Sequence, residues 1–259
     1  MAAGLRRQSG DGEMKAMTLL EAIMLAADLL GTVAFALSGA LVAFDRELDL
    51  FGVVIIGCTT SCGGGIMRDM MIGRHPPSIF TDYPYILFIA TAVSLLSFCV
   101  IWRLKDRYHA LRPKIDMVVN IFDALGLSSF AVAGVMMVEN MGFADDPMLT
   151  IFLGTLTGVG GGALRDLLTG STPYIFRKHI YALAAMAGCT IYYIGGYCLH
   201  YHEIAAFVAM FTVFAIRLLA TKFRWKLPHI TIPPELPSGD LGSENPPRQT
   251  YFLRHFKRK

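Results

Sequence analysis

The sequence predicts an all-α polytopic membrane protein with seven transmembrane helices, arranged as two inverted three-helix repeats and a seventh helix. Three observations predict this fold class. Of the 259 residues, 54% are hydrophobic and only 17% are charged, whereas an average soluble domain has about 25% charged residues. The apolar residues gather in runs that are long enough to cross a bilayer. One short glycine motif also occurs twice, in the second and in the fifth of these runs.

The first half of the chain contains three of the predicted spans. The first runs from about Leu19 to Phe44 and is rich in small residues, which let transmembrane helices approach closely. The second runs from about Leu50 to Ile72 and is closed by Pro76 and Pro77, since paired prolines cannot continue a helix. The third runs from about Tyr83 to Trp102, and a basic loop follows it.

The second half repeats the first. Asp123 corresponds to Asp28 at a separation of 95 residues. The glycine motif recurs at a separation of 97, because the connecting loop Glu139–Pro147 is two residues longer than its counterpart. Such self-similarity indicates an internal duplication of three spans. The last of these spans lies at about His179 to Leu199, and a seventh, without a counterpart, lies at about Ile204 to Thr221.

The domain organisation follows from this duplication. Both ends of the chain are polar, and the last segment is also rich in proline and basic residues, a composition typical of disorder. We expect a disordered N-terminal tail, a first repeat, a second repeat, a seventh transmembrane helix and a disordered basic tail, at residues 1–18, 19–112, 113–202, 203–226 and 227–259.

Loop charge predicts the orientation in the membrane. The odd-numbered connections between spans carry more Lys and Arg than the even-numbered ones, which are mainly acidic. The positive-inside rule therefore places the odd connections and the C-terminus in the cytoplasm and the N-terminus outside. Three spans per repeat is an odd number, so the two repeats cross the membrane in opposite directions and are inverted repeats.

The motif that occurs twice is a glycine triplet followed by an Arg-Asp pair. Glycines permit unusual backbone dihedrals, and we expect the triplets to break the second and fifth helices. A break at membrane depth is tolerated only where it is buried in protein or lines a wet cavity, and charged residues there mark solute or ion paths. The predicted pathway residues are Gly63, Gly64, Gly65, Arg68, Asp69, Gly160, Gly161, Gly162, Arg165 and Asp166.

The charged residues of the motif allow more than one role. Helical spacing puts Arg68 and Arg165 one turn beyond the glycines, where they either control ion occupancy of a conduit or bind an anionic group. Asp69 and Asp166 point about 100° away, toward neighbouring helices. Alternatively, the Arg-Asp pairs lock the two repeats together through salt bridges. Further candidates for lining a conduit are Asp28, Ser61, Asp123 and Thr157.

Several classes of function do not fit the sequence. The five cysteines and seven histidines form no ligand cluster, so we expect no metal site and no cofactor. Signatures of serine hydrolases, phosphate-binding loops and zinc proteases are absent, so the sequence does not predict an enzyme. The net charge of +3 is too small to indicate binding to nucleic acid.

The repeated pattern resembles a known family. Two copies of Asp-x-x-Gly, Phe-Ala-x-x-Gly and Gly-Gly-Gly-x-x-Arg-Asp, with a seventh span after them, resemble the prokaryotic relatives of the trimeric intracellular cation (TRIC) channels. Their repeat is also described as a glycine transporter domain, or UPF0126. The resemblance covers about residues 19–222. It implies a homotrimer in the bacterial inner membrane, with membrane lipids as partners and a hydrophilic pore for K⁺ and Na⁺ in each protomer. It further implies that both glycine motifs, with Arg68 and Arg165, shape the pore.

The charged residues alone do not determine which solute the protein transports. An arginine near a cation path repels cations unless Asp69 or Asp166 neutralises it or the arginine acts as a gate. A small zwitterion such as glycine, in contrast, presents a carboxylate that an arginine can hold. On the resemblance, the predicted function is therefore a monovalent cation channel. The alternative is a secondary transporter of a small amino acid.

Overall fold

The computed structural model describes residues 18–104, 108–173, 175, 180–223 and 225, all within one structural unit. Six helices in this part of the chain are long and apolar enough to cross a membrane. They are α1 (Leu19–Asp45), α2 (Leu50–Met71), α4 (Pro84–Arg103), α5 (Tyr108–Val138), α6 (Pro147–Leu168) and α9 (His202–Lys222). A short π-helix, η2 (Glu139–Phe143), continues α5.

Helices α1, α2, α4 and α9 coincide with the predicted first, second, third and seventh spans to within a few residues, and α5 and α6 supply the fourth and fifth spans, for which the sequence gives no bounds. The predicted sixth span falls on α8 (Tyr181–Tyr192) and on the π-helix η3 (Tyr193–Cys198) that continues it. Neither is among the membrane-length helices, so the described residues contain six candidate spans where the sequence predicts seven. The two predicted tails lie outside the described residues, apart from Thr18.

The second helix of each repeat begins and ends with the same local signals. Asp49 before α2 and Asp146 before α6 are the N-cap residues, and each accepts a backbone hydrogen bond from the first turn, at 2.7 and 3.0 Å. Such caps satisfy donors that the helix itself leaves unpaired. Just after the helices, Gly73 and Gly170 have φ values of 74° and 66°, the left-handed conformation that commonly ends a helix at glycine.

The predicted breaks at the glycine triplets are wrong. Helices α2 and α6 continue without interruption through all six glycines. The glycines instead let the two helices touch: a Cβ atom on Gly64 would lie 2.0 Å from the carbonyl oxygen of Thr157, and one on Gly161 would lie 1.9 Å from that of Thr60. Missing side chains thus serve close packing, while intact helices keep their backbone hydrogen bonds, which are costly to lose in lipid.

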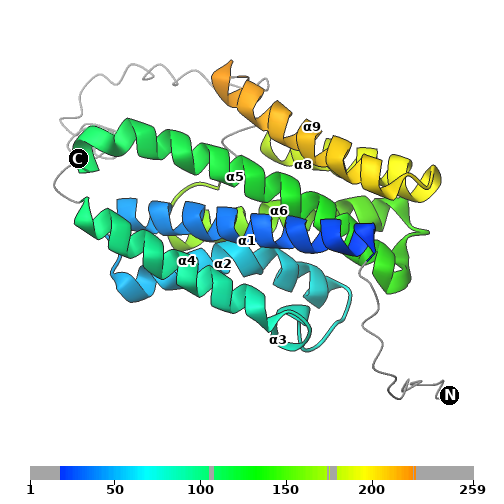
Figure 1. The fold of residues 1–259 in the computed structure, drawn as a ribbon, viewed down its shortest axis with the longest axis horizontal. Helices are drawn as coiled ribbons and strands as arrows, with labels where there is room; N and C mark the ends of the chain where they lie inside the picture. Colours follow the sequence, from blue (N-terminus) through cyan, green and yellow to red (C-terminus); the bar gives the residue numbers. More distant parts are fainter. Residues whose placement is uncertain (1–17, 105–107, 174, 176–179, 224, 226–259) are drawn as a thin grey trace, which may run out of the picture. The chain divides into compact units, whose positions relative to one another are not determined.

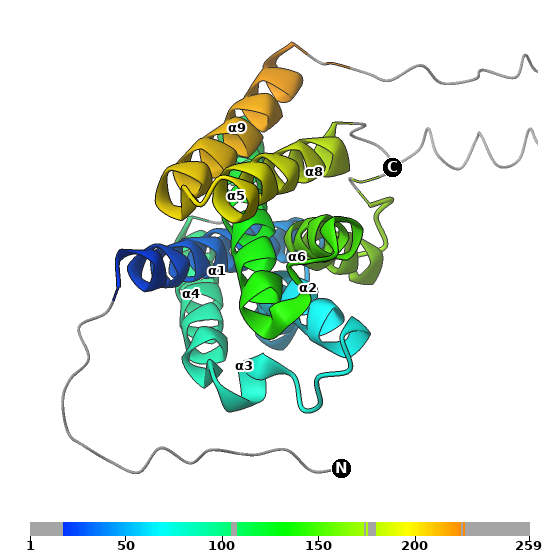
Figure 2. The ribbon, with the colours of Figure 1, turned by 90° about the vertical axis from the view of Figure 1, so that its right-hand side faces the viewer.

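The helices form a centre with two flanks. In the centre, α1 contacts α2 and α5, and α6 also contacts α2 and α5. Figure 2 shows α4 with the short helix α3 (Ser78–Thr81) on one side of this centre and α8 with α9 on the other. Helix α4 packs on α1 and α2 of its own repeat, and α8 packs on α5 and α6 of its own. Helix α9, which packs on α5 and α8, has no counterpart in the first repeat (Figure 1).

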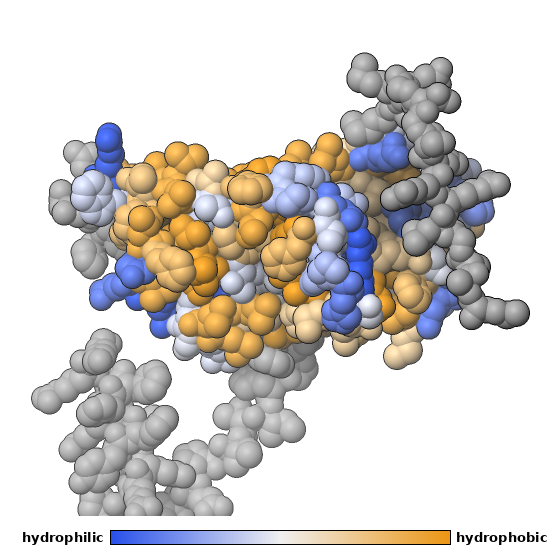
Figure 3. Space-filling model, turned by 90° about the horizontal axis from the view of Figure 1, so that it is seen from below, coloured by the Kyte–Doolittle hydropathy of each residue, from blue (hydrophilic) through white to orange (hydrophobic). Residues whose placement is uncertain are grey.

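The outer surface of the bundle suits lipid. Seen from below the view of Figure 1, it is mostly apolar, with hydrophilic residues toward the ends and in one band (Figure 3). Large apolar side chains point outward from the flanking helices, such as Phe88 of α4 at 75% exposure and Phe211 of α9 at 72%. Because apolar surface of this extent is stable in a bilayer and not in water, the protein is a multi-pass integral membrane protein.

Connections that the sequence places on one side of the membrane lie at the same end of the bundle. Arg46, after α1, donates a hydrogen bond to Ser171, after α6. Asp45, at the end of α1, forms an ion pair at 3.1 Å with Arg112, near the start of α5. The first, third and fifth connections therefore share an end, as alternate crossing of a membrane requires.

Candidate functional site

In the first repeat, the Arg-Asp pair of the glycine motif forms a buried cluster. The guanidinium of Arg68 donates to one carboxylate oxygen of Asp69 from Nε at 2.9 Å and from Nη2 at 2.8 Å. The other oxygen of Asp69 accepts from the backbone N–H and the hydroxyl of Ser78, at 2.7 and 2.6 Å. Asp69 therefore neutralises Arg68 and also anchors the start of α3. The two side chains meet, although helical spacing predicts that they point apart.

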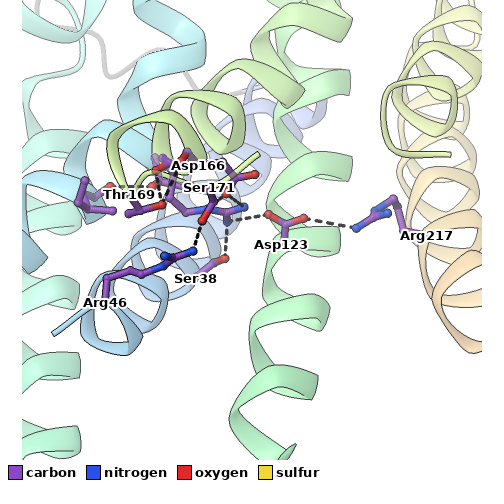
Figure 4. Close-up of polar contacts among 10 residues, drawn as sticks. Ser38, Arg46, Asp123, Asp166, Thr169, Ser171 and Arg217 are labelled. Carbon is purple, nitrogen blue, oxygen red and sulfur yellow. Dashed lines mark hydrogen bonds and ion pairs between the residues drawn. The ribbon is translucent and has the colours of Figure 1, made fainter. Parts of the chain in front are cut away.

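The matching cluster of the second repeat is larger. Arg165 donates to Asp166, Asp123 and Ser38, each at 2.9 Å. Asp123 also pairs with Arg217 of α9 at 3.5 Å, and Figure 4 shows Arg217 projecting from α9 toward Asp123. Arg165 and Asp123 are fully buried. A buried ion pair is favourable only when further hydrogen bonds complete it. Arg165 has such bonds, whereas the Nε atom of Arg217 has no hydrogen-bond partner among the described residues.

The predicted locking of the repeats by salt bridges does not occur among the described residues of the motif. The ion pairs of Arg68 and Arg165 lie within their own repeats. The polar contact of Arg165 that joins the repeats is its hydrogen bond to Ser38 of α1. The repeats also meet through close contacts of glycine against backbone between α2 and α6 and through apolar packing of α1 on α5.

Arg217 and its neighbour Tyr181 belong to this site but are not among the residues that the sequence predicts. The guanidinium carbon of Arg217 lies 4.6 Å from the centre of the Tyr181 ring, a favourable cation–π distance. Arg217 is 1% exposed. The signal that could have found it is its position as an isolated charge inside an apolar span, since such residues need a buried partner and are seldom accidental.

A cavity of about 50 Å³ lies beside Arg68. It has room for water, which fills such spaces when polar groups line them. Polar residues from α1, α2, α3 and α6 contribute to its wall, and apolar residues of α5 close it. The lining includes five of the predicted pathway residues, namely Asp28, Ser61, Gly65, Arg68 and Thr157.

The other predicted pathway residues lie elsewhere in the described structure. The remaining glycines of the triplets pack closely against the opposite helix or against Tyr181, and the other charged residues are held in ion pairs. These are Gly63, Gly64, Gly160, Gly161 and Gly162, and Asp69, Asp123, Arg165 and Asp166.

Asp28 differs from its counterpart Asp123. Its carboxylate faces the cavity and makes no hydrogen bond or ion pair with another described residue. Tyr83 also lines this cavity. Burial, together with the carboxylates of Asp28 and Asp82, raises the pKa of the Tyr83 hydroxyl, so this group remains a protonated hydrogen-bond donor at neutral pH.

Comparison with protein families and relatives identifies the repeats. A family model described as "Glycine transporter" matches residues 25–102 and 120–196. The UPF0126 inner membrane protein YadS of Escherichia coli K12 is 35% identical over 205 residues, which cover 78% of this chain and 93% of YadS. The UPF0126 membrane protein YvgT of Bacillus subtilis is 32% identical over 207 residues, with the same coverage of 78% and 93%.

Solved structures of TRIC channels have the same fold. A prokaryotic TRIC channel crystallised in 0.5 M KCl has a TM-score of 0.68 and 33% identity, covering 80% of this chain and 99% of that one. A TRIC orthologue from Rhodobacter sphaeroides has a TM-score of 0.69 and 30% identity, covering 78% and 99%. The chain therefore belongs to the UPF0126, or glycine transporter, family and shares the fold of the prokaryotic TRIC cation channels, which are channels and not enzymes.

Proposed function

We propose that this protein is a monovalent cation channel that conducts K⁺ and Na⁺ through a hydrophilic pore in each protomer of a homotrimer. The main support for this proposal is the cavity beside α2 and α6. It lies in a fold that this chain shares with structures described as cation channels. Its wall offers the hydroxyl groups of Ser61 and Thr157 and the carboxylate of Asp28. Oxygen ligands of this kind replace the hydration shell of an alkali cation.

The charge balance of this cavity favours a cation. Arg68 lines the cavity, and on its own would repel cations. Because Asp69 binds its guanidinium directly, Arg68 contributes little net charge, and ionised Asp28 leaves the site negative. Fixed charge of one sign in a low-dielectric cleft concentrates ions of the opposite sign. We therefore assign Arg68 the role of narrowing or gating the path.

Single-channel recording tests this function. Purified protein in planar bilayers under a KCl gradient should give cation-selective unitary currents, and Arg68→Ala should raise the unitary conductance because it removes a positive group from the wall. Arg165→Ala is the matched variant in the second repeat, and comparison of the two separates a role on the path from a structural one. A silent bilayer with folded wild-type protein would refute the channel.

A transporter of a small amino acid is the second candidate. Two observations favour it: the family is described as glycine transporters, and both Asp28 and Arg68 lie in one cavity wall. A carboxylate and a guanidinium together match the ammonium and carboxylate groups of a zwitterion such as glycine. A carrier would show saturable uptake of glycine into proteoliposomes without unitary currents, which distinguishes it from the channel.

We also propose the arrangement in the membrane. Helix α8 and η3 together form the sixth span. The two repeats, residues 19–112 and 113–202, then have three spans each, and α9 is the seventh. The positive-inside rule supports an N-terminus outside and a C-terminus in the cytoplasm. The name of the Escherichia coli relative supports the inner membrane as the location, with surrounding lipids as partners.

A further inference from the structure

The two repeats place the same residue types at matching positions but surround them differently. Asp28 and Asp123 correspond, as do Arg68 and Arg165. Asp28 faces a cavity, whereas Asp123 is fully buried between two guanidinium groups. A duplication that remained symmetrical would surround the two carboxylates alike, so the described surroundings of Asp123 have been filled where those of Asp28 stay open.

The filling comes from α9 and α8. Arg217 of α9 pairs with Asp123, and its guanidinium lies over the ring of Tyr181 in α8. Tyr181 covers the glycine triplet of α6: a Cβ atom on Gly162 would lie 2.8 Å from the tyrosine hydroxyl. At the corresponding Gly65 of α2, a Cβ atom would have nothing closer than 3.8 Å, the Nη2 atom of Arg68. The first repeat has no counterpart of α9 to fill its cavity.

The charges of the two sites differ for the same reason. With all groups ionised, Asp28, Arg68 and Asp69 leave the first site with an excess of one negative charge. In the second site, Arg217 balances the corresponding excess of Asp123, Arg165 and Asp166. Among the residues that the structure describes, the first site therefore combines open space with a charge that attracts cations, and the second site has its carboxylates balanced by arginines.

We propose that Asp28 is the carboxylate that draws monovalent cations into the cavity of the first repeat, and that Arg217 is a built-in counterion that fills the equivalent position of the second repeat. The proposal deepens the channel function above and rests on it for the identity of the permeating ion. The asymmetry of access, in contrast, is a property of the fold and is measurable without any current.

Cysteine modification of the full-length protein in proteoliposomes tests this asymmetry. Cys62 lines the cavity, and Val159 is its counterpart 97 residues later. In a background with the other four cysteines replaced by alanine, the positively charged reagent 2-aminoethyl methanethiosulfonate should modify Cys62. It should leave Val159→Cys, combined with Cys62→Ala, unmodified on the same timescale. Mass spectrometry of the intact protein gives both rates, and Gly65→Cys is a second reporter in the cavity.

Two further variants test the assigned roles. Asp28→Asn should slow modification of Cys62 by the charged reagent about tenfold or more, while the rate with neutral methyl methanethiosulfonate stays the same. Arg217→Ala should make Val159→Cys reactive. Elution in size-exclusion chromatography, together with labelling of Gly65→Cys in the same background, verifies that each variant is folded.

The outcomes separate this inference from the channel itself. Three results would overturn the proposed asymmetry of access. They are equal modification of Cys62 and Val159→Cys, no modification of Cys62 and Gly65→Cys, and an equal effect of Asp28→Asn on both reagents. If Val159→Cys stays protected without Arg217, the sealing role is overturned. The predicted labelling pattern without any unitary current would leave the one-sided cavity in place and refute the cation channel.

Discussion

At the scale of single residues, three adjacent glycines of α2 have different neighbours. Gly64 meets the backbone of Thr157 on the opposite helix, where a Cβ atom would lie 2.0 Å from a carbonyl oxygen. Gly65, the next residue, has only the end of the Arg68 side chain near it, at 3.8 Å. Backbone cannot move aside as a flexible side chain can, so the same substitution has different consequences at the two positions.

We expect Gly64→Ala to destabilise the protein and Gly65→Ala to be tolerated. Overpacking in a well-packed interior costs about 1–3 kcal/mol, and α2 and α6 would have to separate to admit the new methyl group. Gly161→Ala should reproduce the loss, because its Cβ atom would lie 1.9 Å from the carbonyl oxygen of Thr60. Thermal unfolding of the detergent-solubilised protein measures all three. Equal melting temperatures for Gly64→Ala and Gly65→Ala would contradict this account of the motif.

At the scale of helices, α9 is attached to the bundle by charge as well as by apolar contact. Asp123 of α5 lies between Arg165 and Arg217. Loss of Arg217 leaves Asp123 with one cation, whereas loss of Asp123 leaves Arg217 without the carboxylate it pairs with. An unpaired charge in a buried site is more costly than a missing pair.

A double-mutant cycle tests this attachment. Asp123→Leu should lower the free energy of unfolding by about 3–5 kcal/mol, the usual cost of breaking a buried pair from one side. Arg217→Leu should cost less, because Arg165 still pairs with Asp123. The double variant should recover part of the loss, since it leaves no unpaired partner. Strictly additive effects in equilibrium unfolding would mean that the two residues do not interact.

The sequence predicts the helices better than their contacts. The bounds of α1, α2, α4 and α9 follow from the ends of apolar runs and from flanking charged residues, glycines and prolines, all of which are local signals. A glycine triplet is compatible with a broken helix and with a tightly packed one, and only the partner helix decides between them. The roles of Arg217 and Tyr181 likewise depend on the position of α9 and α8 beside α5, which no local pattern contains.

At the scale of the whole molecule, the shared end of the odd connections sets up a test of orientation. The contacts of Arg46 with Ser171 and of Arg112 with Asp45 place these segments together, and their positive charge predicts that they face the cytoplasm. Alkaline phosphatase fused after Ala144 should be active outside the cytoplasm, and green fluorescent protein fused after Phe223 should fluoresce inside it. The reverse pattern for both fusions would invert the proposed topology.

The contact between the repeats has a further consequence. Gly64 meets Thr157 as Gly161 meets Thr60, which is the reciprocity of an isologous dimer interface. Two separate chains, one for each repeat and inserted in opposite directions, would find the same contact that the continuous chain makes with itself. We therefore expect residues 1–104 and 108–259, expressed together as separate polypeptides, to co-purify, and Gly64→Ala to weaken this association. The peptide link between the halves then serves to guarantee one copy of each orientation, and the close approach of the two halves depends on the glycines of α2 and α6.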